Sequence, residues 1–375
     1  MNCSVCDKVA HLKVKRKLQA CHIHLDITEW IVDFLGERTQ RVAVINDKGV
    51  HVLLSPIPVL SRVPQGTMLG LSLFNIYIND APEILQNLLT LYADDSKLIG
   101  AASSWAEAAS IQANLNKLDD WARQWLLEFN SSKCKVLHFG NKNQKHIYTM
   151  QNQITGQREP LVAVTEERDL GVIVDCQLKF QCHTEKIVAS ANCALGTIKQ
   201  TFTTRSPQTI TKLYKSLVRP RLETGMSIAS PFYKVDKDMI EKVKRRATKI
   251  VDGCQHLPYP MRLQTLNLCS MTYQRKRGDM IKTYKLIHNN PIHGLFFNDS
   301  SQWTRGHSKK LIKVNAQRRE CHHFLTNWVV DQWNSLSNHT VSSKTVKEFK
   351  LSLDKEWSNK EWRLEWDTLE SQIRK

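Results

Sequence analysis

Two adjacent acidic residues, Asp94 and Asp95, lie between two short runs of β-prone apolar residues, 88–92 and 96–99. This pattern predicts a tight hairpin whose turn carries both carboxylates. Two carboxylates held together repel each other, and a divalent cation relieves that repulsion. Mg²⁺ prefers oxygen ligands and keeps open positions for phosphate oxygens, so such a pair can support phosphoryl transfer. An isolated pair of this kind is more often a solvated hairpin tip, so the surrounding sequence must decide between the two interpretations.

Further motifs stand in a fixed order around the acidic pair. The block VPQGTMLG at 63–70 and the run LFNIYIND at 73–80 precede the pair, which itself lies in YADD at 92–95. Others follow along the chain: WLLEFN at 125–130, KCKVLHFG at 133–140, DLGV at 169–172 with Asp175, LVRPRLE at 217–223, RRATK at 245–249, RGDM at 277–280 and WNSL at 333–336. This ordered set resembles the reverse transcriptases of non-LTR retrotransposons (LINE and jockey-like elements), and the resemblance covers nearly the whole chain.

The resemblance implies chemistry for three residues at or near the acidic pair. Asp94 would ligate a catalytic Mg²⁺, with Asp95 as its less strict companion. Lys133 would lie near the transferring phosphates, where a lysine can act as an acid toward pyrophosphate. The implied reaction is the RNA-templated addition of a dNTP to a DNA primer, which is RNA-directed DNA polymerase activity.

The resemblance also implies residues that contact the nucleic acid. Gln65, Gly66 and Tyr92 would lie against the incoming nucleotide and the template, and the glycine would let the backbone approach closely. A second set of residues would grip the primer end: Leu170, Gly171 and Val172. The implied partners are an RNA template, a DNA primer and the RNA–DNA hybrid that they form.

One carboxylate that the family needs is absent from its expected place. The family's first motif reads approximately DFSKAFDKVPH, and residues 1–11 of this chain read MNCSVCDKVAH. The metal-binding aspartate therefore falls on Met1 and the aromatic residue that screens the sugar falls on Cys6, while Asp7 matches a second, non-ligating aspartate. A thioether cannot replace a hard oxygen ligand for Mg²⁺. We therefore expect an N-terminally truncated polymerase that is inactive on its own.

The net charge of +17 comes from one segment of the chain. Residues 201–350 carry 27 basic and 10 acidic residues, whereas residues 1–150 carry 16 and 14. Within that segment, residues 239–251 predict an amphipathic helix. Its basic face carries Lys242, Arg245, Arg246 and Lys249. Such a face is either a solvated surface or a surface that follows nucleic-acid phosphates, and the local charge excess favours the second. The clusters 275–277 and 309–313 extend the same pattern.

A zinc module is the competing interpretation of the N-terminus. Cys3, Cys6, Cys21 and His24 have a spacing typical of zinc ligands. Against it, the first two cysteines fall inside the altered first motif, and the other two residues lie in a segment that is predicted to be helical. We therefore favour the polymerase interpretation.

We expect an α+β fold in three parts. Residues 1–180 would form a partial reverse-transcriptase palm, an antiparallel sheet with packed helices that includes the VPQG block and the YADD hairpin. Residues 181–255 would form a helical thumb, and residues 256–375 a basic helical C-terminal domain. Helices are predicted over 11–36, 69–79, 104–127, 187–202, 210–219, 239–251 and 280–288. Strands are predicted over 41–45, 51–54, 88–92, 96–99, 135–139 and 170–174, and loops over 55–62 and 140–158.

No apolar run is long enough to cross a bilayer, and the N-terminus lacks the apolar stretch of a signal peptide. The ten cysteines are spread irregularly, which favours reduced thiols. We therefore expect a soluble intracellular protein, nuclear or cytoplasmic, that has no membrane partner. Two alternatives to an enzyme stay open, a nucleic-acid-binding protein without catalysis and a non-functional retroelement remnant.

Overall fold

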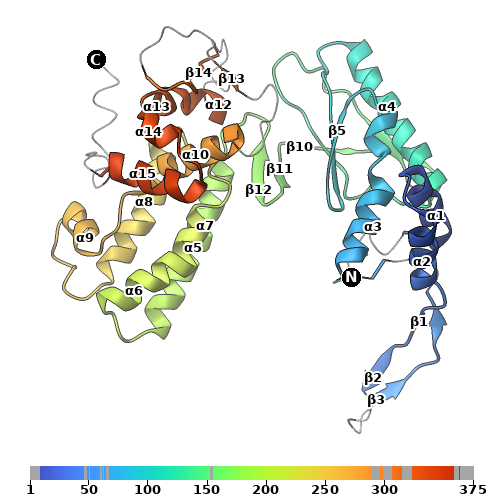
Figure 1. Ribbon diagram of the computed structural model, residues 1–375, viewed down its shortest axis with the longest axis horizontal. Helices are drawn as coiled ribbons and strands as arrows, with labels where there is room; N and C mark the ends of the chain where they lie inside the picture. Colours follow the sequence, from blue (N-terminus) through green and yellow to red (C-terminus); the bar gives the residue numbers. More distant parts are fainter. Residues whose placement is uncertain are drawn as a thin grey trace. The chain divides into compact units, whose positions relative to one another are not determined.

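The computed structural model describes residues 9–45, 49, 51–59, 61, 63–64, 67–152, 155–288, 296–298, 306–314, 323–358 and 363. The chain divides into two compact units, residues 1–165 (unit 1) and residues 166–375 (unit 2) (Figure 1). Both units mix helices with small two-stranded sheets. Among the described residues, no helix combines the length and the apolar character that a membrane span requires.

Unit 1 is built around four α-helices and a short 3-10 turn. They are α1 (His11–Ala20), α2 (Leu25–Leu35), α3 (Met68–Ile78), η2 (Ala81–Ile84) and α4 (Trp105–Trp125). The prediction of one helix over 11–36 was wrong, because His22 has a φ of 56° and interrupts it. His24 then caps α2, with its Nδ1 accepting a hydrogen bond from the backbone N–H of Asp26.

A buried lysine ties three of these helices together. The Nζ atom of Lys17 on α1 lies 2.5 Å from a carboxylate oxygen of Asp80, directly after α3. The same Nζ lies 3.5 Å from the ring centre of Trp125 and 5.1 Å from that of Trp121, both on α4. The Trp121 indole N–H also donates to Asp80. Burial lowers the pKa of Lys17, and the bond to Asp80 opposes that shift.

The strands of unit 1 form short pairs. The antiparallel pairs are β1 (Thr39–Gln40) with β4 (Ile57–Pro58), β2 (Ala43–Ile45) with β3 (His51–Leu53), β5 (Leu88–Tyr92) with β6 (Asp95–Ile99), and β8 (Thr149–Gln151) with β9 (Arg158–Pro160). β7 (Lys135–Leu137) pairs with β10 (Val162–Val164) in parallel. The predicted loops at 55–62 and 140–158 were therefore partly wrong, since they contain β4, β8 and the start of β9.

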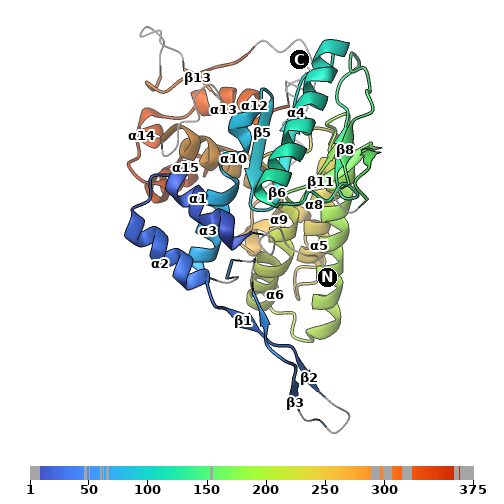
Figure 2. The same cartoon turned by 90° about the vertical axis from the view of Figure 1, so that its right-hand side faces the viewer.

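The ribbon β2–β3 extends away from the helices of unit 1 (Figure 2). Every residue of both strands is exposed. The exposed side chains include large apolar ones: Val42, Val44, Ile45, Val52, Leu53 and Leu54. The turn of this predicted hairpin, at 46–48 and 50, lies outside the described residues.

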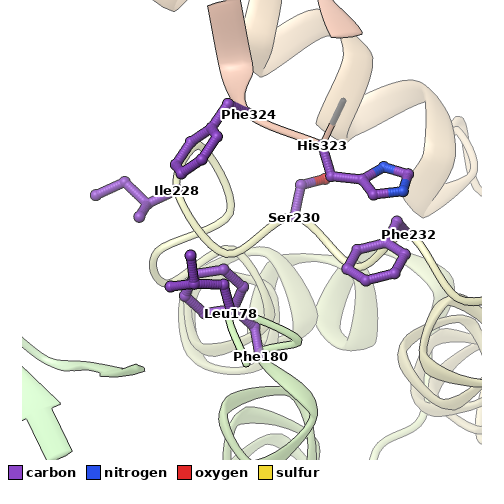
Figure 3. A pocket seen from close by; sticks show the side chains of 7 residues that line it. All are labelled: Leu178, Phe180, Ile228, Ser230, Phe232, His323 and Phe324. Carbon is purple, nitrogen blue, oxygen red and sulfur yellow. The ribbon is translucent and has the colours of Figure 1, made fainter. Parts of the chain in front are cut away.

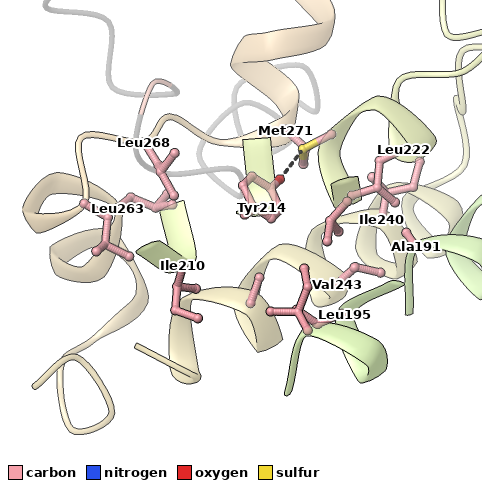
Figure 4. Close-up of a cluster of buried hydrophobic side chains, with 14 of the residues drawn as sticks. Ala191, Leu195, Ile210, Tyr214, Leu222, Ile240, Val243, Leu263, Leu268 and Met271 are labelled. Carbon is pink, nitrogen blue, oxygen red and sulfur yellow. Dashed lines mark hydrogen bonds between the residues drawn. The ribbon is translucent and has the colours of Figure 1, made fainter. Parts of the chain in front are cut away.

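Unit 2 begins with the hairpin β11 (Glu166–Asp169) and β12 (Val172–Asp175) and then becomes helical. Its first group of helices is α5 (Gln181–Thr201), α6 (Pro207–Leu213), the π-turn η3 (Tyr214–Val218), α7 (Arg219–Leu222), α8 (Lys234–Lys249), α9 (Tyr259–Thr265) and the start of α10 (Met271–His288). These helices share one apolar core, in which the Tyr214 hydroxyl contacts the Met271 sulfur (Figure 4). The helix predicted over 210–219 is thus part of a longer segment that a π-turn interrupts.

The second core of unit 2 forms between α10 and the C-terminal helices. These helices are α12 (Leu325–Trp328), α13 (Val330–Asn334), α14 (Asn338–Val341) and α15 (Val346–Glu356), and β13 (Phe297–Asn298) pairs with β14 (Leu311–Ile312) beside them. Trp333 and Phe349 are fully buried there. Because α10 contributes to both cores, it joins the two groups of helices.

Candidate functional site

The acidic pair lies at the tip of the predicted hairpin, and this part of the prediction is confirmed. Strands β5 and β6 pair with Tyr92 opposite Asp95, so Ala93 and Asp94 alone form the turn. Ala93 has a φ of 51°, which a two-residue hairpin turn requires. Asp94, Asp95 and Tyr92 are exposed, and Tyr92 is 67% exposed. The tip of the hairpin therefore presents both carboxylates and the tyrosine to solvent.

The base of the YADD hairpin (residues 88–99) is fixed on α4. Asn114 of α4 accepts a hydrogen bond from the backbone N–H of Gln86, and its amide donates to Asn87. Gly100 follows β6, and an added Cβ there would come within 2.7 Å of Asn87 and Ile111. Leu89 of β5 is buried in the unit 1 core. A rigid base thus supports an exposed tip.

The described residues offer an incomplete metal site. Asp94 and Asp95 are adjacent, yet no group of three or more His, Cys, Asp or Glu side chains that could hold a metal ion occurs in the described part of the chain. Two exposed carboxylates are fewer ligands than a two-metal site uses. The described residues therefore do not supply the ligands of a complete magnesium centre.

Lys133 lies in a turn between α4 and β7 and is exposed. Its backbone N–H bonds to the carbonyl of Asn130, which fixes the turn. It belongs to the same unit as the YADD hairpin, and its proposed role near the phosphates stays a prediction.

Two of the predicted site residues in the VPQG block, Gln65 and Gly66, lie outside the described residues. The structure describes the block on either side of them, at 63–64 and 67–70. Thr67 caps α3, and its hydroxyl accepts from the Gly70 N–H and donates to the Pro64 carbonyl. An added Cβ at Gly70 would come within 2.1 Å of that carbonyl oxygen. The close approach of residue 70 to the Pro64 carbonyl therefore requires a glycine there.

Leu170 and Gly171 form the two-residue turn of the hairpin β11–β12, here called the LGV hairpin (residues 166–175). Their φ angles are 45° and 90°. Leu170 is 56% exposed, whereas Val172 is buried against Phe180 and Ala229. The predicted strand over 170–174 thus begins two residues later, and the three predicted primer-grip residues divide into an exposed turn and a buried anchor.

Asp175 closes the LGV hairpin at its base. Its carboxylate accepts three backbone hydrogen bonds, from Gln177 at 2.9 Å, Lys179 at 3.1 Å and Phe180 at 2.6 Å. These bonds hold a turn in which Leu178 and Phe180 have positive φ angles. The aspartate of the DLGV-x-x-D motif therefore shapes the passage from β12 into α5.

His183 and Gly225 clamp the LGV hairpin against the helices. The buried His183 ring accepts from the Ile173 N–H at its Nδ1 and donates from its Nε2 to the Thr224 carbonyl, 3.0 Å away. Gly225 has a φ of 69°, and an added Cβ would lie 2.6 Å from a methyl group of Val172. No side chain fits between the hairpin and the chain at 225.

Replacing Gly225 with alanine is expected to lower the free energy of unfolding of unit 2 by about 1–3 kcal/mol, because the added methyl overpacks a closed contact at a positive φ. Urea denaturation followed by circular dichroism measures this loss. The matched control is Gly278→Ala in α10, where nothing lies within 4 Å of an added Cβ. That change should stabilise the helix slightly. Equal stability of Gly225→Ala and the wild type would contradict the clamp.

Helix α8 presents three of its four predicted basic residues to solvent. Lys242, Arg246 and Lys249 are exposed, while Ile240 and Val243 are buried as expected. Arg246 also donates to Asn192 of α5. We call Lys242, Arg246 and Lys249 the α8 basic surface.

Arg245 lies apart from that surface. It is half-buried, and its guanidinium carbon lies 5.0 Å from the ring centre of Tyr259. Next to it, Lys244 is completely buried, and its Nζ donates to the Cys269 carbonyl. Burial lowers the pKa of Lys244, and the nearby Glu241 opposes that shift. Basic residues on α8 therefore serve both the core and the surface.

The other basic clusters are largely engaged within unit 2. Arg275 is buried, and Arg277 makes a two-pronged ion pair with Asp354 at 2.5 and 2.7 Å. Burial lowers the pKa of Lys276 to about 8. Lys313 pairs with Asp331. Four basic residues of these clusters therefore have structural roles within unit 2, and most of the charge excess of 201–350 lies elsewhere in that segment.

The zinc interpretation gains no support from the described residues. Cys3 and Cys6 lie outside them. Cys21 is an exposed free thiol at the end of α1, and His24 caps α2.

The structure thus brings some predicted site residues together and leaves others apart. Tyr92, Asp94 and Asp95 lie together at the tip of one hairpin in unit 1, whereas the LGV hairpin and the α8 basic surface belong to unit 2. The sequence reading missed the positioning residues His183 and Gly225. Of the two, only Gly225 could have been noticed in the sequence, because it is a glycine two residues after the LVRPRLE motif.

A hydrophobic hollow lies beside the base of the LGV hairpin. Figure 3 shows His323 and Phe232 face to face, with Leu178 and Phe180 on the side of α5. The rings of Phe232 and His323 are 4.0 Å apart between centres. The segment before α12 therefore packs against Phe232, and it lines the hollow together with the turn that Asp175 shapes.

Comparison with known proteins matches these motifs to a family. Residues 5–174 match the family described as reverse transcriptase (RNA-dependent DNA polymerase). The chain is similar to the RNA-directed DNA polymerase from mobile element jockey of Drosophila melanogaster, at 23% identity over 63% of this chain and 26% of that protein. The jockey polymerase of Drosophila funebris is 25% identical over 59% of this chain and 24% of its own length.

The probable RNA-directed DNA polymerase from transposon BS of Drosophila melanogaster is 25% identical over 62% of this chain and 26% of its own length. The chain therefore spans about a quarter of the length of these relatives. The matched residues include the VPQG block, the YADD hairpin and the turn of the LGV hairpin. These matches support a reverse transcriptase similar to those of non-LTR retroelements over residues 5–174.

Proposed function

We propose that the chain carries the YADD hairpin and the hybrid-binding surface of an RNA-directed DNA polymerase. The observation that carries this proposal is the tight turn that presents Asp94 and Asp95 side by side within a reverse transcriptase domain. In this role the two carboxylates would hold Mg²⁺ together with a further oxygen ligand. The substrates would be a dNTP, a DNA primer and an RNA template.

The proposed organisation is a palm over 1–180, a thumb over 181–255 and a C-terminal domain over 256–375. Support for the thumb comes from the apolar core that α5 to α8 share, a group of packed helices that follows the LGV hairpin. Support for the C-terminal domain comes from the second core between α10 and α15. In this arrangement Leu170 and Gly171 would contact the primer, since their turn is the exposed end of a firmly anchored hairpin.

The α8 basic surface would hold the RNA–DNA hybrid. An A-form helix is recognised mainly through its backbone, and lysine and arginine neutralise its phosphates. Lys242, Arg246 and Lys249 are exposed on a helix whose opposite face is buried, so they are presented from a rigid support. Arg245 would act from within the fold, through its contact with Tyr259.

Binding of a short RNA–DNA hybrid tests this proposal. Replacing Lys242, Arg246 and Lys249 with alanine is expected to weaken binding and to reduce the slope of log affinity against log salt by about 2 to 3, since each phosphate contact contributes about 0.7–0.9. The matched control replaces Lys344, Lys347 and Lys355, three exposed lysines in or near α15, and removes the same charge. An equal loss of hybrid affinity in both variants would contradict the proposed surface.

A nucleic-acid-binding protein without catalysis is the second candidate function. The observation that favours it is the ligand set, because the described residues supply two carboxylates and no group of three metal-binding side chains. The two candidates share the α8 basic surface and differ in whether restoring the first-motif aspartate gives primer extension.

A further inference from the structure

A row of four aromatic rings crosses unit 1 at a place that has no part in the site above. The ring centres of Trp105 and His146 are 5.4 Å apart, those of His146 and Tyr148 are 5.2 Å apart, and those of Tyr148 and His138 are 6.2 Å apart. The four rings come from three places in the chain: the start of α4, the loop before β8, and the residue after β7. The fold therefore brings together rings that lie apart in the sequence.

The row is open to solvent at one end. Trp105 is 67% exposed at the first position of α4, and His138 and His146 are half-buried. Tyr148 is buried, and its hydroxyl has no hydrogen-bond partner among the described residues. The buried ring of Tyr148 packs between the two histidines, and the exposed indole of Trp105 presents a ring surface to solvent.

Two lysines are held beside the open end by a well-defined loop. Gln144 binds the residues before α4, with its backbone N–H on the Ala102 carbonyl at 3.0 Å and its side chain on the Ser103 carbonyl at 3.2 Å. Asn143 accepts from the Lys145 N–H at 2.8 Å. Lys142 and Lys145 are exposed on either side of this anchor.

The segment that supplies three of the four rings is one-sided in charge. Residues 129–158 contain five basic residues and no acidic one, whereas the whole of unit 1 contains 17 basic and 15 acidic residues. The acidic side chain nearest in sequence to Trp105 is Glu107, whose carboxylate accepts the backbone N–H groups of Ser103 and Ser104 in a capping box. That carboxylate is engaged in capping the start of α4, and among the described residues neither lysine forms an ion pair with a carboxylate.

We propose that this surface, which we call the Trp105 platform, binds single-stranded nucleic acid. It consists of Trp105, His138, Lys142, Lys145, His146 and Tyr148. A base would stack on the exposed indole, and the two lysines would contact the adjoining phosphates. A single strand fits because its bases are free to stack on a protein ring, whereas the bases of a duplex are already stacked on each other. The platform lies in unit 1 and is independent of the α8 basic surface in unit 2.

The test measures binding of the full chain to fluorescent 12-nucleotide oligo(rU) and oligo(dT) by anisotropy. Trp105→Ala is expected to weaken binding of at least one oligonucleotide about fivefold or more, the effect of losing one stacked base. Trp105→Phe should retain most of the affinity. The matched control is Trp30→Ala, which removes another exposed tryptophan, 58% exposed on α2, and should leave binding unchanged.

The salt dependence of binding tests the role of the two lysines. The variant Lys142→Ala/Lys145→Ala is expected to lower the slope of log affinity against log salt by about 1.4, because each phosphate contact on a single strand contributes about 0.7. Its control, Lys347→Ala/Lys355→Ala on α15, removes two exposed lysines elsewhere and should leave the slope unchanged.

Comparing the affinities for the two oligonucleotides shows whether the platform prefers RNA or DNA. Tighter binding of oligo(rU) would assign the platform to an RNA strand, and tighter binding of oligo(dT) to single-stranded DNA. The triple variant of the α8 basic surface separates the two proposals, since it should lose hybrid binding and keep oligonucleotide binding. Unchanged affinity of Trp105→Ala for both oligonucleotides, or an equal loss in Trp30→Ala, would overturn the platform.

Discussion

The chain is expected to give no Mg²⁺-dependent extension of a DNA primer on an RNA template. By the resemblance of residues 1–11 to the family's first motif, the metal-binding aspartate would fall on Met1, and a thioether cannot replace a hard oxygen ligand for Mg²⁺. Asp94 and Asp95 would then face the metal without their third carboxylate partner. Losing a ligand that stabilises the transition state costs about 4 kcal/mol or more, which is roughly a thousandfold in rate.

Primer extension with labelled primer and saturating dNTP measures this activity. The matched control is Asp94→Ala, which should give the same background as the wild type. A restored chain, with an added initiator methionine before Met1→Asp and with Cys6→Phe, should extend better than the wild type and lose that gain with Asp94→Ala. Extension by the unaltered chain that Asp94→Ala abolishes would contradict the expectation.

Unit 2 is expected to lose stability as the pH rises from about 4 to about 7, because of one buried aspartate. Asp279 on α10 is 6% exposed, and burial raises its pKa from 3.8 to about 7, against the opposing effects of the Trp328 indole N–H and Arg275. In this interval the folded state holds a proton that the unfolded state releases. Its stabilising contribution is therefore complete below about pH 4 and is lost as the pH passes 7.

The size of the effect follows from the two pKa values. The gap between 3.8 and about 7 corresponds to at most about 4 kcal/mol of unfolding free energy. Asp279→Asn should remove this dependence, because the amide cannot ionise and its oxygen still accepts from Trp328. Relative to the wild type, the variant should gain stability above pH 7 and little at pH 4.

Urea denaturation at several pH values, followed by circular dichroism, measures the difference between Asp279→Asn and the wild type. The control Asp331→Asn changes an exposed aspartate in the same unit and should leave the pH profile close to that of the wild type. Parallel pH profiles for the wild type and Asp279→Asn would show that Asp279 ionises in the folded protein as freely as in water.

Local features of the site could be predicted from the sequence, because their signals are local. The YADD hairpin depends on two short apolar runs and the residues between them, and β5 and β6 formed there as predicted. Helix α3 was likewise predicted, since Thr67 caps it and an apolar run follows. In both cases the neighbouring residues alone determine the conformation.

Features that depend on distant partners could not be predicted. Strand β8 lies in a polar segment, and its backbone is satisfied by side chains of α4: Thr149 donates to Gln112 and Gln151 donates to Asp119. Arg275 looked like surface charge in a basic run, yet it is buried. The periodicity of one segment does not reveal which helix will cover it.

The exposed ribbon β2–β3 has a practical consequence for every binding experiment on this chain. Among the described residues the two strands pair only with each other, so their outer edges and apolar side chains face solvent, and chains add strands to one another through such features. Self-association through such edges grows with protein concentration and brings several basic surfaces together. A titration at high concentration would then report an avidity that belongs to the aggregate, and dilute protein reports the affinity of the single chain.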